Sequence, residues 1–299
     1  MLNIYLDTNL WNELLTQNVS PNDVVSSLAS KDARLVLSDE VIYELAKTFM
    51  KADSSGVQEG RRFFSYLKDF IALEVPVTKD NMALIAAEMQ ALQWQMTHVN
   101  PVLTPDDYEV VRSMVGHLSN DELTAEEKAR TNKRQARRAF DRDGQVRFFA
   151  EKPDLKKAYI NIAPDSFSSW IQREERTPLA VRYLAFEIHK YFPEYPMSDA
   201  EEYAVALRSA KTNRVSRGLI RRNISINWRA AHRDSVPKDI YPDSTLIVNA
   251  NYCDIYATKE RGQTEYASLL LTDSTRVCVY DPQTPIDEWL LTCASPTQP

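Results

Sequence analysis

Short apolar segments alternate with helical segments at both ends of this 299-residue chain. In the first hundred residues we expect strands at 2–6, 34–37 and 74–78, with helices at 9–15, 21–28, 39–51, 58–73 and 81–94. Near the other end the pattern predicts helices at 243–252 and 263–271 and strands at 254–257 and 276–280. Strands that alternate with helices form a parallel sheet covered by helices, so the chain is predicted to have an α/β fold.

The middle of the chain has a different pattern. From about 101 to 238, long helical stretches follow one another with polar joints and no convincing strand. The simplest organisation is one α/β domain built from residues 1–100 and 239–299. A large all-helical insertion at 101–238 then separates its two halves.

Composition excludes several classes of protein. The six glycines are too far apart for a GxGxxG motif or a P-loop. The three cysteines lack CxxC spacing, which argues against a disulfide framework or a structural zinc site. No apolar run approaches the roughly 18 residues of a membrane span, and no basic leader precedes the first strand. We therefore expect a cytoplasmic protein without a membrane partner.

An acidic residue, Asp7, ends the first predicted strand and is followed by Thr8 and Asn9. In an open parallel sheet the carboxyl ends of the strands line the ligand crevice, so Asp7 is expected at its rim. The alternative is a helix N-cap, because Asp, Thr and Asn all cap well.

Further acids stand at comparable places. Glu44 lies beside the apolar face of the helix after the second strand and could reach over the sheet edge, whereas Glu40 is expected to be solvated. Asp243 starts a late helix, Asp254 stands where that helix passes into the next strand, and Glu260 follows that strand. A surface position for Glu44 and a capping role for Asp243 are the alternatives.

Carboxylates a few ångströms apart repel one another and raise one another's pKa, so a cluster of them is stable in its charged form only with cations among them. Mg²⁺ and Mn²⁺ prefer oxygen ligands, and a pair of such ions can activate water and stabilise the leaving oxygen of a phosphodiester. The four histidines are dispersed and show no zinc-binding pattern. The acids therefore predict a site for Mg²⁺ or Mn²⁺.

These motifs resemble those of the PIN-like nuclease family. The resemblance rests on Ile-Tyr-Leu-Asp-Thr-Asn at 4–9, Ser-x-x-Val-x-x-Glu at 38–44, Asp243, and Cys-Asp-Ile-Tyr-Ala-Thr-Lys-Glu at 253–260. It covers about 1–80 and 240–290. It implies a doubly wound parallel sheet flanked by helices, and a metal-dependent endonuclease that acts on RNA or sometimes DNA. By motif position, the family's acidic roles belong to Asp7, Glu44, Asp243 and Glu260.

One position departs from the family pattern. Relatives commonly carry Thr-x-Asp after the late strand, whereas this chain has Thr258, Lys259 and Glu260. Either Glu260 still acts as the fourth acid of the site, or Asp254 takes its place. The departure from the pattern is also compatible with a weakened second metal site. Thr8, Asn9 or Thr258 would assist the acids through hydrogen bonds.

Basic residues are concentrated in the predicted insertion. Of the 36 Lys and Arg residues, 17 lie at 128–147 and 208–238, so the net charge of -6 combines an acidic body with a basic insertion. Arginines at helical spacing form rows that suit phosphates. The arginines expected to bind nucleic acid are Arg130, Arg134, Arg137, Arg138, Arg214, Arg217, Arg221 and Arg222. The alternative is a solvated face or a site for an acidic partner.

Together these features predict a divalent-metal-dependent endonuclease with RNA favoured over DNA as its substrate. A role as a toxin or phage-defence effector, an inhibitor or antitoxin protein as partner, and a homo-oligomer are each compatible with such an enzyme. Two alternatives stay open. One is a catalytically weakened PIN-like scaffold that binds nucleic acid or a partner protein, and the other is a DNA structure-specific nuclease.

Overall fold

The computed structural model describes residues 1–51, 54–210, 213–233, 235–272 and 274–295. Two charged residues of the second basic stretch, Lys211 and Asp234, lie outside the described residues. No helix of the described chain is long and apolar enough to cross a membrane.

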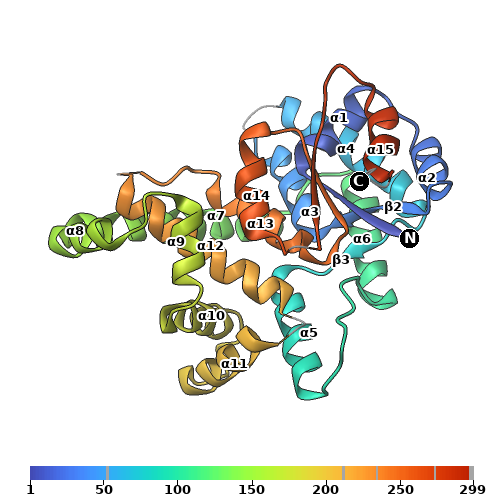
Figure 1. The fold of residues 1–299 in the computed structure, drawn as a ribbon. Coiled ribbons are helices and arrows are strands. Elements are labelled where there is room, and N and C mark those ends of the chain that lie inside the picture. Colours follow the sequence, from blue (N-terminus) through green and yellow to red (C-terminus); the bar gives the residue numbers. More distant parts are fainter. Residues whose placement is uncertain (52–53, 211–212, 234, 273, 296–299) are drawn as a thin grey trace.

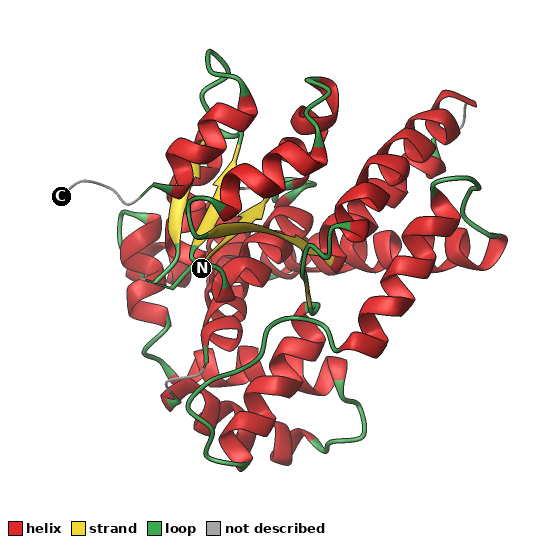
Figure 2. Cartoon of the chain, turned by 90° about the vertical axis from the view of Figure 1, so that its right-hand side faces the viewer, coloured by secondary structure: helices red, strands yellow, loops and turns green. Residues whose placement is uncertain are grey.

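A five-stranded, all-parallel sheet forms the centre of the α/β part, with helices on both sides (Figure 2). The strands are β1 (Leu2–Leu6), β2 (Ala33–Ser38), β3 (Val77–Thr78), β4 (Ile255–Thr258) and β5 (Arg276–Val279). Their spatial order is β3-β2-β1-β4-β5. The two ends of the chain therefore share one sheet, because β1 lies between β2 and β4, with Ile4 paired to Ile255. This confirms the predicted α/β fold and its parallel sheet.

The third strand is shorter than predicted because the preceding helix ends in a turn. Glu74 has a φ of 57°, in the left-handed region, and the amide of Val75 donates to the carbonyl of Phe70 at 3.2 Å. Residues 74–76 therefore complete the end of that helix and lead into β3, which begins only at Val77.

Side-chain caps set the starts of several helices around the sheet. Asp7, Ser20, Ser38 and Asp80 accept hydrogen bonds from the first turns of α1, α2, α3 and α5 respectively. The helices of this first part are α1 (Thr8–Thr16), α2 (Pro21–Ala29), α3 (Asp39–Ala46), α4 (Ser54–Ala72) and α5 (Asn81–Gln93), and a 3₁₀ turn, Lys47–Met50, extends α3.

Seven helices and no named strand occupy the described residues of the predicted insertion. They are α6 (Pro105–Leu118), α7 (Ala125–Glu151), α8 (Pro153–Ile162), α9 (Phe167–Glu174), α10 (Pro178–Tyr191), α11 (Met197–Ser209) and α12 (Arg214–His232). In Figure 1, α8 to α11 project away from the sheet. The first helix differs, because α6 packs against α4 and the Tyr108 hydroxyl donates to the carbonyls of Ile71 and Val75. Part of the predicted insertion thus covers the α/β body.

A buried carboxylate ties the long helix α12 to α5. Both oxygens of Glu88 accept amides from the first turn of α12, Val215 at 2.7 Å and Ser216 at 3.0 Å. Glu88 is fully buried, and burial raises its pKa to about 7. A carboxylate at a helix N-terminus satisfies free amides and opposes the helix dipole, so α5 fixes where α12 begins.

The last part of the chain returns to the sheet. It contains α13 (Ile240–Asn249), α14 (Thr264–Leu270) and α15 (Ile286–Ala294), with 3₁₀ turns at Ala250–Tyr252 and Arg261–Gln263. The terminal helix α15 was not predicted. It packs against α1 and α2, and the ring of its Trp289 meets that of Tyr280 edge to face.

Candidate functional site

The strand order places a crevice at the carboxyl ends of β1 and β4. From β1 the chain moves outward to β2 and β3, whereas β4 and β5 lie on the other side of β1, so the winding direction changes between β1 and β4. Such a switch point is where open α/β sheets bind ligands. Asp7 directly follows β1, and Glu260 stands two residues beyond the end of β4.

Asp7 is held in place by bonds to both of its carboxylate oxygens. Oδ1 accepts the amide of Leu10 at 2.8 Å, and Oδ2 accepts the hydroxyl of Thr258 at 2.5 Å. Asp7 thus caps α1 and also stands at the switch point. The helix cap and the position at the crevice, given as alternatives from the sequence, therefore both hold. Its side chain is buried, and burial raises its pKa to about 6 against the opposing effect of these hydrogen bonds.

Asp243 occupies the first turn of α13 and is partly buried. Among the described residues, its carboxylate has no hydrogen-bond or ion-pair partner. Burial raises its pKa to about 7, with further contributions from the negative charges of Glu260, Glu44, Asp239 and Asp7. These charge interactions join Asp243 to the other predicted acids in one electrostatic cluster.

The remaining two acids of the cluster have polar partners. Glu44 accepts the Thr8 hydroxyl at 3.0 Å and pairs with Lys47 at 3.0 Å. Glu260, which is exposed, accepts the side-chain amide of Asn9 at 2.8 Å and that of Gln263 at 2.6 Å. Thr8, Asn9 and Thr258, the predicted supporting residues, each donate to one acid of the cluster.

Lys259, the neighbour of Glu260 in the chain, pairs with a different acid. The Lys259 ammonium group lies 2.6 Å from a carboxylate oxygen of Glu13, on the exposed side of α1. Lys259 therefore neutralises Glu13, whereas the carboxylate of Glu260 accepts hydrogen bonds from two side-chain amides.

The suggestion that Asp254 completes the site is wrong. Asp254 precedes β4 and lies at the amino end of the sheet, where its Oδ2 accepts the amide of Asn3 at 2.7 Å. Asp254 and Thr258 are four positions apart along the strand, which corresponds to about 13 Å. Because β4 runs parallel to β1, Asp254 faces the edge opposite Asp7, and its carboxylate instead satisfies a backbone amide.

The donor chemistry of the cluster fits a hard divalent cation, since all four side chains offer carboxylate oxygens. In the described part of the chain, however, no three His, Cys, Asp or Glu side chains are placed close enough to hold a metal ion. Asp7, Glu44 and Glu260 already accept hydrogen bonds or ion pairs from protein groups. The Asp243 carboxylate has no such partner among the described residues.

Glu40 contradicts the expectation that it is solvated. It is 3% exposed and forms ion pairs with two predicted nucleic-acid-binding residues, Arg134 and Arg138 of α7. The Arg134 guanidinium also lies 3.9 Å from the centre of the Tyr43 ring. From the sequence, only the apolar face of α3 was expected to be buried. In the structure, α7 also covers the opposite, charged face, which carries Glu40.

Along α12, three of the arginines predicted to bind nucleic acid form ion pairs within the protein. Arg222 is buried and pairs with Glu187 at 2.8 Å. Arg217 and Arg221 both bind Glu175, at 2.5 and 3.3 Å. The helical spacing is as predicted, but neighbouring helices supply carboxylates along this face.

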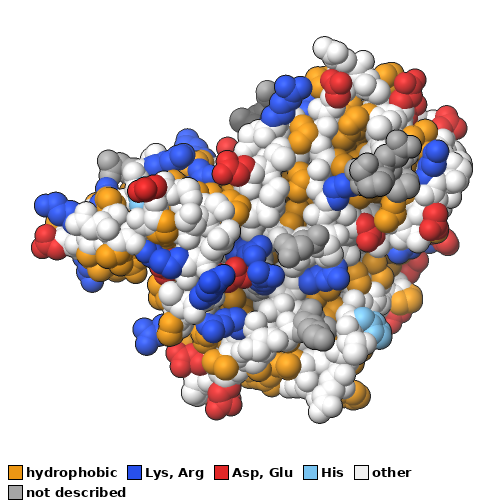
Figure 3. All heavy atoms as spheres, in the orientation of Figure 1, with side chains coloured by type: hydrophobic (Ala, Val, Ile, Leu, Met, Phe, Trp, Pro, Cys, Tyr) orange, Lys and Arg blue, Asp and Glu red, His pale blue; other side chains and the backbone are white. Residues whose placement is uncertain are grey.

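Three other arginines have different surroundings. Arg214 donates to the carbonyl of Asn251 at 3.5 Å. Arg130 is a surface residue paired with Glu126 one turn away, and Arg137 is exposed with no ion-pair partner among the described residues. In Figure 3 Lys and Arg gather over the helical part on the left, with acidic side chains among them. Much of the positive charge counted in the sequence is therefore neutralised within the fold.

Comparisons with known proteins give no match: no family model, curated protein or solved structure resembles this chain closely enough to be identified.

Proposed function

We propose that this protein is a divalent-metal-dependent endonuclease of PIN-like type that hydrolyses phosphodiester bonds, with RNA favoured over DNA. The observation that supports the proposal is that the negative charges of Asp7, Glu44 and Glu260 all act on Asp243 near the switch point of a parallel sheet. Four separate elements contribute these acids, from positions up to 253 residues apart in the chain.

The side chains divide the work of such a site. Asp7 is the most rigid ligand, because Leu10 and Thr258 fix both of its oxygens. Thr8 orients Glu44 and Asn9 orients Glu260, whereas Asp243 keeps a free carboxylate. Bound Mg²⁺ or Mn²⁺ would supply the positive charge that activates water and stabilises the leaving oxygen.

Cleavage of labelled RNA and DNA panels by the full chain in Mg²⁺ or Mn²⁺ tests the proposal. We expect cleavage that chelation abolishes and that Asp7→Asn reduces at least about 100-fold, because loss of one charged ligand weakens both ion binding and charge stabilisation. Asp254→Asn is the matched control, since it removes an equal charge at the opposite sheet edge. Equal activity in wild type and Asp7→Asn, or equal loss in Asp254→Asn, would contradict the proposal.

One observation favours a second candidate, a non-catalytic PIN-like scaffold that binds nucleic acid or a partner protein. In the described chain the acids are not arranged as a ready three-ligand metal site, and Glu260 stands where the family pattern has Asp. Calorimetry separates the two candidates. A nuclease should give a Mn²⁺ binding heat that Asp7→Asn removes, whereas a scaffold should bind nucleic acid in a salt-dependent way without that heat.

A further inference from the structure

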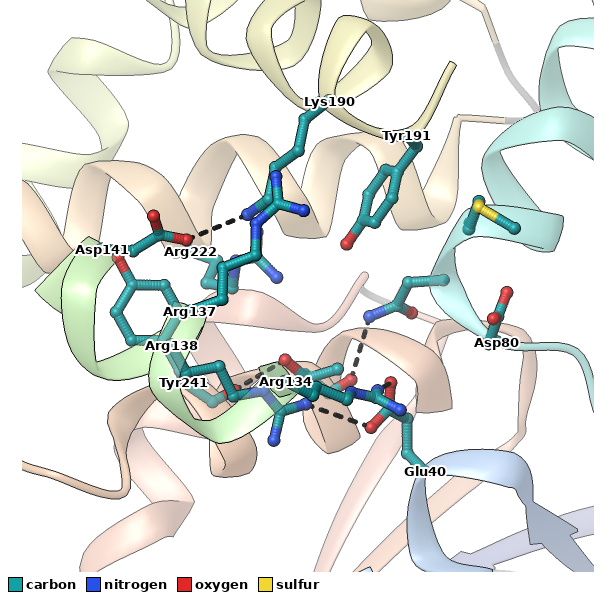
Figure 4. Close-up of a pocket in the computed structure, with 13 residues that line it drawn as sticks. Glu40, Asp80, Arg134, Arg137, Arg138, Asp141, Lys190, Tyr191, Arg222 and Tyr241 are labelled. Carbon is teal, nitrogen blue, oxygen red and sulfur yellow. Dashed lines mark hydrogen bonds and ion pairs between the residues drawn. The ribbon is translucent and has the colours of Figure 1, made fainter. Parts of the chain in front are cut away.

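A charged pocket lies where the helical part meets the α/β part, apart from the acidic cluster. Its volume is about 230 Å³. Elements from both parts line it: α3, α5 and α13 on one side and α7, α10 and α12 on the other. None of the four clustered acids is among its lining residues, so it is a separate site (Figure 4).

Positive charge exceeds negative charge among the lining residues. The cations are Arg134, Arg137, Arg138, Lys190 and Arg222, and the anions are Glu40, Asp80 and Asp141. Each anion already has a protein donor: Glu40 binds two arginines, Asp141 pairs with Lys190 at 3.2 Å, and Asp80 caps α5. Outside the lining, Glu187 pairs with Arg222 and the charge of Asp39 acts on Arg134, so the positive excess is confined to the residues that line the pocket.

That excess is accompanied by hydrogen-bond donors without acceptors. Within the described residues, Nε of the buried Arg222 and Nη1 of Arg138 are buried and have no hydrogen-bond partner. Arg137 has no ion-pair partner there either, and Figure 4 shows it extending toward the same part of the pocket as Lys190. Unpaired buried donors are costly, so two guanidinium groups in the wall of this pocket have incompletely satisfied hydrogen bonds.

Two tyrosines complete the lining. Burial raises the pKa of Tyr191 and of Tyr241 to about 12, so both hydroxyls stay protonated at neutral pH and can donate hydrogen bonds. Neither hydroxyl has a hydrogen-bond partner among the residues that the structure describes. Their rings also offer flat apolar surface beside the charged groups.

We propose that this pocket binds the phosphate group of a nucleotide. Arg137 and Lys190 contact it from the open side, Arg222 and Arg138 from the inner side, and Tyr191 or Tyr241 borders the attached sugar or base. Guanidinium groups suit phosphate because several of their N–H donors engage its oxygens at once. The volume is below the roughly 300–1,000 Å³ typical of drug-sized ligands, so the pocket fits a phosphate with part of its nucleoside.

Titration calorimetry with the full-length Asp7→Asn chain in EDTA tests this site without any hydrolysis. The probes are inorganic phosphate, AMP, adenosine and a single-stranded oligoribonucleotide with or without a 5′-phosphate. We expect AMP to bind at least about tenfold more tightly than adenosine, because its phosphate accepts charge-assisted hydrogen bonds that adenosine lacks. A 5′-phosphate that strengthens oligonucleotide binding assigns the pocket to a strand end, and an equal effect of both oligonucleotides assigns it to free nucleotides; either result supports a phosphate site.

Matched variants of α7 decide whether the phosphate occupies this pocket. Arg137→Ala should weaken AMP binding about tenfold, while Lys133→Ala, which removes an exposed charge from the same helix outside the pocket, should leave it unchanged. Absence of AMP binding at millimolar concentration, equal binding of adenosine, or equal loss in both variants would overturn the proposal. Because the measurement uses an inactive chain without metal, failure of the nuclease hypothesis leaves this result unaffected.

Discussion

Charged residues have different partners in the acidic cluster at the sheet edge and in the basic pocket between the helical part and the α/β part. At the sheet edge, carboxylates gather with few cations among them, and the pKa values of Asp7 and Asp243 rise as a result of burial and mutual repulsion. In the pocket, buried carboxylates such as Glu40 and Glu187 neutralise most of the arginines. In the first region carboxylates lie near other carboxylates, whereas in the second most arginines are paired with carboxylates and Arg137 has no ion-pair partner among the described residues.

The strongest test of this contrast is the buried pair of α10 and α12. Arg222→Ala leaves Glu187 charged and unpaired, and breaking a buried ion pair costs about 3–5 kcal/mol. Urea unfolding of the variant should show a loss of that size. The double variant Arg222→Met with Glu187→Leu should recover most of it, and a loss below about 1 kcal/mol in Arg222→Ala would show that the pair is not structural.

A smaller effect is expected at the junction of α3 and α7. Glu40→Ala removes the acceptor of Arg134 and Arg138, which are only partly buried and can be rehydrated. Loss of hydrogen bonds to a charged group predicts a decrease of roughly 1.5–3 kcal/mol in the free energy of unfolding. An unchanged free energy would mean that Glu40 is solvated in solution, as the sequence suggested.

The acidic cluster should make the free energy of unfolding depend on pH. The native Asp243 carboxyl group, with a pKa of about 7, keeps a proton that the unfolded chain releases near pH 4. Raising the pH from 5 to 8 without metal therefore destabilises the folded state through this group, by at least about 1 kcal/mol. Unfolding at the two pH values should show this decrease in wild type and less of it in Asp243→Asn; identical decreases would contradict the shift.

The smallest effect is expected on the exposed face of α7. The Arg130 side chain is 75% exposed and pairs with Glu126, which is itself exposed. Surface pairs of this kind contribute little, so Arg130→Ala should change the free energy of unfolding by less than about 0.5 kcal/mol. Urea unfolding of both Arg130→Ala and Arg222→Ala would show how far the contribution of an arginine to the free energy of unfolding varies between an exposed and a buried position.

The sheet was predictable because its strands are local apolar segments bounded by polar residues and helix caps. All five strands and their parallel arrangement follow from the alternation at the two ends of the chain. The terminal helix α15 was missed, and the insertion boundary shifts because Tyr108 attaches α6 to the end of α4. Such packing depends on contacts between distant residues and leaves no local pattern.

The sequence by itself determined where Asp7, Glu44 and Glu260 stand relative to their own strands and helices, since residue order sets which element each side chain follows. Only the tertiary structure decided that Asp254 faces the opposite edge, because that depends on the direction of β4 beside β1. It also decided which arginines are free. Helical spacing places residues on one face of a helix, but the elements packed against that face determine whether it meets solvent, a ligand or a buried carboxylate.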